Sequence, residues 1–232
     1  MTEEMRDYKP IQPRGGGPNI KKVLERIGGI ALVIGGAAIK FGFIFVKFFG
    51  FFISVAAYTL LFHSWTFAFG FVLMILVHEL GHAAEARRQG LEVSAPMFIP
   101  FIGAYVKIRH AGLTPWRNAL ISLAGPAAGG AAAAVVWAIG SARGSSTLVA
   151  LAYLGFLLNA FNMIPIGFLD GGQIFHAMTE AWRMPVIQFE GGVPVQAFAP
   201  DRTRALLIGA LYVGLAAALV AGMVATKHAH GL

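Results

Sequence analysis

The sequence contains no cysteine, and only 12% of its 232 residues are charged. Without cysteine there can be no disulfide framework, no thiolate zinc site and no cysteine nucleophile, so any bound metal must be held by His, Asp or Glu. The scarcity of charge, together with 57% hydrophobic residues and a mean hydropathy of +0.69, excludes an ordinary soluble domain. These values predict an integral membrane protein.

Long apolar runs predict an all-α membrane protein with about five, possibly six, transmembrane helices. A span of about 20 apolar residues crosses roughly 30 Å of hydrocarbon. Runs of that length occupy residues 43–62, 66–86, 119–139, 148–169 and 205–226. The apolar run at 27–39 is too short to cross, so we expect a re-entrant or interfacial segment there. Whether residues 27–47 span the membrane is left open by the pattern.

Proline, glycine and mixed charges dominate residues 1–26, a composition typical of a flexible tail. The remainder, 27–232, is expected to form a single membrane-embedded domain. Sixteen of the eighteen Lys and Arg residues fall on one side if the N-terminus is cytosolic. This positive-inside bias explains the net charge of +7 as a topology signal rather than a nucleic-acid surface. We therefore expect a multi-pass protein of a bacterial inner membrane and no nucleic-acid partner.

The segment between the second and third runs does not read as a helix. Pro96, Pro100 and Gly103 interrupt it, and the residues after them alternate between polar and apolar. This pattern predicts a short β-hairpin at the inner membrane surface.

Ionisable side chains inside the second run indicate a functional site, because a charge in the bilayer costs several kcal/mol. His78 lies nine residues before Arg87, which places it roughly 13 Å deep on a rise of 1.5 Å per residue. The sequence His78-Glu79-Leu80-Gly81-His82 puts two imidazoles on one helix face with a carboxylate beside them, as in zinc hydrolases. The alternative is a pair of core histidines without metal, but three adjacent ionisable groups are hard to bury without a shared ion.

A catalytic zinc usually takes a third protein ligand and keeps an open position. Glu85 lies on the same face as His82, but it is close to the membrane boundary and is expected to pair with Arg88 or a ring nitrogen. Asp170 is the other candidate, because it follows a helix break at Pro165 and can line a polar cavity. Capping of the following helix by Asp170 is an alternative that is compatible with ligation.

Two amides and a pair of glycines complete the set of candidates. Asn162 and Asn159 lie in an apolar run and could hydrogen-bond a substrate backbone or an oxyanion, or else join helices to one another. Gly125 and Gly129 form a GxxxG pattern, which is expected to serve close helix packing.

Two motifs together resemble the site-2 protease family of intramembrane zinc metalloproteases. HELGH at 78–82 and NMIPIGFLDG at 162–171 match the family's HExxH and NxxPxxxLDG pair, in order and with an intervening span. The resemblance covers a three-span core at about 66–172 and implies a compact form without PDZ or CBS domains. It further implies that His78, His82 and Asp170 bind one Zn²⁺, that Glu79 is the general base, and that the substrate is a transmembrane protein or peptide.

Two other functions remain possible for an HExxH helix in a bilayer. A prenyl-protein protease would need a downstream glutamate ligand on a helix, and the later glutamates Glu180 and Glu190 are expected in a loop. A zinc or proton transporter would favour repeated half-structures and ionisable groups on several spans. No internal repeat is visible, and Glu79 has no role in transport.

Overall fold

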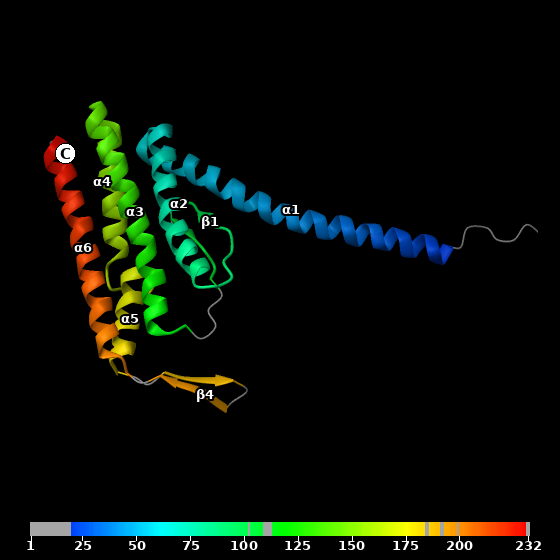
Figure 1. Cartoon of the computed structure of the whole chain (residues 1–232). Helices are drawn as coiled ribbons and strands as arrows, with labels where there is room; N and C mark the ends of the chain where they lie inside the picture. The colour runs from blue at the N-terminus through cyan, green and yellow to red at the C-terminus, as the bar shows by residue number, and fades with distance from the viewer. Residues whose placement is uncertain are drawn as a thin grey trace, which may run out of the picture. The chain divides into compact units, whose positions relative to one another are not determined.

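The computed structural model describes residues 20–101, 103–108, 113–183, 186–190, 193–198 and 200–230 (Figure 1). Most of the predicted tail at 1–26 therefore lies outside the described residues. The chain divides into two units, Met1–Val46 and Lys47–Leu232. All the features of the candidate site belong to the second unit.

The described part is mostly helical, as predicted, with two small antiparallel sheets. The helices are α1 (Ile20–Phe62), α2 (Trp65–Arg88), α3 (Pro115–Arg143), α4 (Ser146–Asn162), α5 (Asp170–Arg183) and α6 (Arg202–His230). The strands are β1 (Met97–Ile99), β2 (Gly103–Tyr105), β3 (Val186–Glu190) and β4 (Val193–Phe198). Helix α3 is the centre of the second unit, because it contacts α2, α4, α5 and α6.

Among the described residues, α2, α3 and α6 are long and apolar enough to cross a membrane. They correspond to the second, third and fifth predicted spans. Two shorter apolar helices, Phe49–Phe62 and α4, accompany them.

The structure differs from the predicted ends of two apolar segments. Helical secondary structure continues through residues 39–43, so the segment at 27–39 is not separated from the following run. Lys40 and Lys47 interrupt the run of apolar residues, but lysine is a good helix former and does not end a helix. The fourth run, 148–169, is helical only as far as Asn162. The residues after it are apolar but form turns, because Pro165 cannot donate a helical hydrogen bond.

Helix starts are set by side-chain caps that are visible in the sequence. Ser64, Thr114 and Ser145 precede α2, α3 and α4, and each side-chain oxygen accepts the backbone N–H three residues on, at 3.4 Å. Helix α3 also begins with a proline and ends at Gly144, whose φ of 61° is in the left-handed region that glycine adopts easily.

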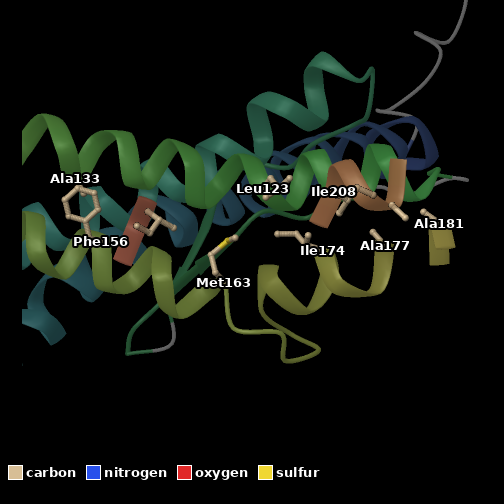
Figure 2. Packing of buried hydrophobic residues seen from close by; sticks show 11 residues of the cluster. Leu123, Ala133, Phe156, Met163, Ile174, Ala177, Ala181 and Ile208 are labelled. Atoms are coloured by element: carbon tan, nitrogen blue, oxygen red, sulfur yellow. The ribbon is translucent and has the colours of Figure 1, made fainter. Parts of the chain in front are cut away.

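One hydrophobic cluster joins α3, α4, α5 and α6. Figure 2 shows Leu123 of α3, Ile174 of α5 and Ile208 of α6 meeting within it, and both isoleucines are almost completely buried. Phe156 and Met163 extend the cluster along α4 and its end. Because Ile174 lies one turn beyond Asp170, this cluster fixes the position of the carboxylate at the start of α5.

The hairpin predicted after the HExxH helix is present. Strands β1 and β2 pair antiparallel with Phe98 opposite Ala104. The hairpin packs on the C-terminal part of α1, where the Phe51 and Phe98 rings meet edge to face with centroids 5.3 Å apart. Glu180 and Glu190, predicted to lie in a loop, instead belong to α5 and to the β3–β4 hairpin.

Candidate metal centre

Helix α2 presents His78 and His82 on one face, as their spacing predicted. Both rings are buried, and their Nε2 atoms lie 3.1 Å apart. Glu79 is half-buried beside them. One carboxylate oxygen of Glu79 lies within 4.8 Å of the ligand atoms of both histidines, so Glu79 belongs to the same cluster of side chains around a possible metal position.

Asp170 lies closer still to the two rings. Its Oδ2 is 3.1 Å from Nε2 of His78, and its Oδ1 is 3.2 Å from Nε2 of His82. Among the described residues its carboxylate caps no backbone N–H, so the side chain is directed at the imidazoles although it stands at the first position of α5.

The segment before Asp170 is shaped by close backbone packing. Helix α4 ends at Asn162, and a turn closed by Leu169 N–H donating to Ile166 O, at 2.9 Å, leads into α5. A Cβ atom at Gly171 would collide with the Met163 carbonyl, and one at Gly172 would collide with the Ile166 carbonyl. The two glycines after Asp170 therefore allow the first turn of α5 to lie against this loop.

The outer nitrogens of both rings are already engaged. Nδ1 of His82 lies 2.8 Å from the Ile121 carbonyl of α3, and Nδ1 of His78 lies 2.8 Å from Oδ1 of Asn159 in α4. A carbonyl oxygen can only accept, so each Nδ1 is the donor in its contact, and a ring that carries this one proton presents an unprotonated Nε2 to the centre. Sequence reasoning did not identify either of these contacts.

The donor set fits a divalent metal. When Nδ1 carries the single proton of each ring, neither Nε2 can donate to the other, and Oδ2 of Asp170 is buried without a hydrogen-bond donor among the described residues. The two Nε2 atoms lie 3.1 Å apart, and the Asp170 carboxylate meets both, with one oxygen 3.1 Å from Nε2 of His78 and the other 3.2 Å from Nε2 of His82. Tetrahedral zinc ligands at about 2.0–2.1 Å from the ion stand about 3.3 Å apart, so little movement would be needed. Two imidazoles and a carboxylate with one open position are typical of catalytic zinc.

The GxxxG pair on α3 packs against the site. A Cβ atom at Gly125 would occupy the place of the His82 ring, and one at Gly129 would collide with the Asn159 amide. Gly81, inside the HExxH sequence, meets the Ala124 carbonyl in the same way. The close packing expected of this pair is present, and it leaves room for His82 at the metal site and for Asn159 behind His78.

A cavity of about 500 Å³ opens beside these groups. Its lining includes Glu79, Asp170 and Asn162, and strand β2 forms part of its wall. Asn162 Nδ2 donates to the Leu158 carbonyl at 3.2 Å, while its side chain remains at the cavity surface. Asn159 is fully buried and lies behind His78 rather than on the cavity wall.

Glu85 pairs with Arg88, as expected for a residue near the membrane boundary. Its two carboxylate oxygens accept from Arg88 Nε and a terminal guanidinium nitrogen at 2.6 and 2.7 Å, and Gln89 donates to it at 2.7 Å. Gln89 also accepts from Arg117 Nε at 3.0 Å, which ties the end of α2 to the start of α3.

Comparison with known families identifies the class. The model of peptidase family M50 matches residues 66–144 and 141–193, together more than half of the chain. The chain therefore belongs to peptidase family M50, the family of the site-2 proteases. With three helices suited to crossing a bilayer, it is a membrane protein of this zinc metalloprotease family.

Several curated relatives carry the name zinc metalloprotease. Rip3 of Mycobacterium tuberculosis is 31% identical over 158 residues, which are 65% of this chain and 38% of the relative. The protein sll0528 of Synechocystis is 28% identical over 122 residues, 50% of this chain and 31% of the relative. EGY1 of Arabidopsis thaliana, a chloroplastic protein, is 29% identical over 153 residues, 46% of this chain and 28% of the relative. The matched regions thus span about a third of the length of these relatives.

Proposed function

We propose that this protein is an intramembrane zinc endopeptidase, which hydrolyses a peptide bond in or near a transmembrane segment of membrane-protein substrates. The observation that carries the proposal is the convergence of two imidazole nitrogens and a carboxylate with one buried oxygen, beside a cavity that Glu79 also lines. Membership of peptidase family M50 supports it independently. The proposed metal content is one zinc ion per chain.

His78, His82 and Asp170 would hold the metal. When bound, zinc supplies Lewis-acid polarisation of the scissile carbonyl and makes a water molecule more acidic. Glu79 then acts as a general base that takes a proton from the attacking water, and later as an acid that gives it to the leaving amine nitrogen. Its half-buried position at the edge of the cavity suits both steps, because the carboxylate can face substrate and solvent in turn.

Asn162 is proposed to hydrogen-bond the substrate backbone or the developing oxyanion, since its amide lies on the cavity wall. Asn159 was predicted to share this role. Its Oδ1 and Nδ2 are both engaged within the chain, on His78 and on the Gly155 carbonyl, which does not favour contact with a substrate.

Substrates are proposed to bind in an extended conformation. A helical transmembrane segment has every backbone carbonyl engaged, so it must unwind locally before one can be attacked. Strand β2 belongs to a hairpin of only two strands, and Gly103, Ala104 and Tyr105 all line the cavity. Its free edge can accept an unwound peptide as an added strand.

The proposed orientation places the N-terminus in the cytosol of a bacterial cell, with cleavage near the inner face of the membrane. The basic residues support it, because Arg87 and Arg88 end α2 while Arg117, Arg202 and Arg204 lie in the first turn of α3 or α6. The proposed catalytic core comprises residues 66–172 within a domain at 27–232. Lipid bilayer and a transmembrane substrate are the proposed partners.

The alternative functions find no support. A prenyl-protein protease would need a third glutamate ligand, and Glu180 lies on α5 rather than in the predicted loop. Its carboxylate is 3.7 Å from the exposed His176 and takes no part in the metal site. The family match to a peptidase also disfavours a transporter.

The test uses the full chain in proteoliposomes with a library of fluorescently labelled single-span peptides, and cleavage products are identified by mass spectrometry. Glu79→Gln should lower the cleavage rate by about 10²- to 10⁴-fold. Glu180→Gln makes the same chemical change at a partly exposed site away from the cavity and should leave the rate unchanged. Undiminished cleavage by Glu79→Gln would contradict the assigned chemistry, and zinc uptake by the vesicles without cleavage would indicate a transporter.

A further inference from the structure

We infer that Asn159 is a positioning residue of the metal centre, which fixes the tautomer and the orientation of His78. The inference rests on the proposed zinc site and adds to it a side chain that touches neither metal nor substrate. Asn159 is completely buried on α4, 81 residues away from His78 in the chain, and its Oδ1 lies 2.8 Å from Nδ1 of His78.

The orientation of the Asn159 amide is determined by its second contact. Its Nδ2 donates to the Gly155 carbonyl at 2.7 Å. A carbonyl has no proton to give, so the NH₂ group must face Gly155, and the amide oxygen must face His78. A flipped amide would place two acceptors against each other at Gly155 and two possible donors at His78.

The proton of His78 follows from this orientation. Because Oδ1 of Asn159 can only accept, Nδ1 of His78 is the nitrogen that carries the hydrogen, and in the neutral ring Nε2 keeps a free electron pair for a metal. Nε2 is the atom that lies 3.1 Å from both Asp170 Oδ2 and His82 Nε2. The hydrogen bonds between Asn159 and the Gly155 carbonyl, and between His78 and Asn159, therefore direct Nε2 of His78 toward the proposed metal position. Outer hydrogen bonds of this kind orient metal-ligating histidines in general.

The fold leaves Asn159 in one position. Gly129 of α3 packs against the amide so closely that a Cβ atom there would collide with both of its polar atoms. The ring of His82 is held differently, by the backbone carbonyl of Ile121. Within the described part of the chain, Asn159 is thus the side chain whose replacement would free one ligand ring and leave the other fixed.

The experiment measures zinc affinity of the detergent-purified full chain, by competition with a chromogenic chelator, and the visible spectrum of the Co²⁺-loaded protein. Asn159→Leu removes the acceptor at similar volume and should weaken zinc binding about 10- to 100-fold, with a changed Co²⁺ spectrum. Asn159→Asp keeps an oxygen facing Nδ1 and should bind zinc within a few-fold of the unmodified protein. Thr226→Val, a control at another completely buried polar side chain whose hydrogen bonds stay within α6, should leave both readouts unchanged.

If the Asn159 amide had only a structural role, the variants would differ in another way. In that case Asn159→Leu would lower thermal stability while the folded fraction bound zinc normally, and Asn159→Asp would be the more damaging change; either result would overturn the inference. Should Asn159→Leu not yield folded protein, Asn159→Ala removes the same acceptor without added bulk and carries the same expectation. Zinc-free unmodified protein would refute the proposed metal centre itself, whereas normal zinc in all the variants would refute only the role of Asn159.

Discussion

The imidazole ring of His82 lies directly against the α-carbon of Gly125, where any other residue would carry its Cβ atom. The same ring donates from Nδ1 to the Ile121 carbonyl, one turn earlier on α3. Helix α3 therefore holds one of the two histidines both by a hydrogen bond and by contact. A motif that sequence analysis assigns to helix packing is, in this fold, also part of the metal site.

Gly125→Ala should weaken zinc binding, because the added methyl group must displace the His82 ring. Overpacking of this kind costs about 1–3 kcal/mol. The matched control is Gly130→Ala on the same helix, where the new Cβ would lie 2.5 Å from Cδ2 of Leu219, the end of a flexible side chain that can move. Zinc titration of both variants checks the prediction, and equal affinity in the two would show that the His82 position tolerates displacement.

Gly172→Ala should disturb the position of Asp170, because its Cβ would collide with the Ile166 carbonyl, a backbone atom that cannot rotate away. We expect reduced zinc content together with a lower melting temperature. Gly167→Ala lies in the same loop and meets nothing within 4 Å, so it should behave like the unmodified protein. If Gly172→Ala retained full zinc and stability, the loop before α5 would not be what fixes the carboxylate.

Glu85→Gln should leave zinc content unchanged, because the Glu85 carboxylate is occupied by Arg88 and Gln89 rather than by the histidines. Arg88 is exposed, and exposed ion pairs contribute about 0–1 kcal/mol, so the expected loss of stability is small. Metal analysis and thermal unfolding of the purified variant are sufficient. Loss of zinc would make Glu85 a ligand and would require a different assignment for Asp170.

The sequence predicts the part of the site that depends on local geometry. His78 and His82 share a face because residues four apart on a helix do so, and this holds whatever α2 packs against. Asp170 stands 92 residues beyond His78; the helix break at Pro165 made it a candidate third ligand, and the resemblance to a known family implied the same residue. Its contact with both rings is present.

The features that were not predicted depend on how helices are rotated against one another. Asn159 looked like a substrate contact because it is an amide in an apolar run, and no periodicity tells which neighbour an amide will face. Its contact with His78 arises from the packing of α4 beside α2 and α3. The end of α4 at Asn162 was not predicted, because residues 163–169 are still mostly apolar although they are no longer helical.

The most direct test of the account is the zinc content per chain of the detergent-purified protein, measured side by side with Asp170→Ala and with Glu79→Gln as the folded control. The account predicts about one tightly bound zinc in the unmodified protein and in Glu79→Gln, and its loss in Asp170→Ala, because two imidazoles alone do not complete a catalytic zinc site. No zinc in the unmodified protein, or full zinc in Asp170→Ala, would contradict the site formed by His78, His82 and Asp170.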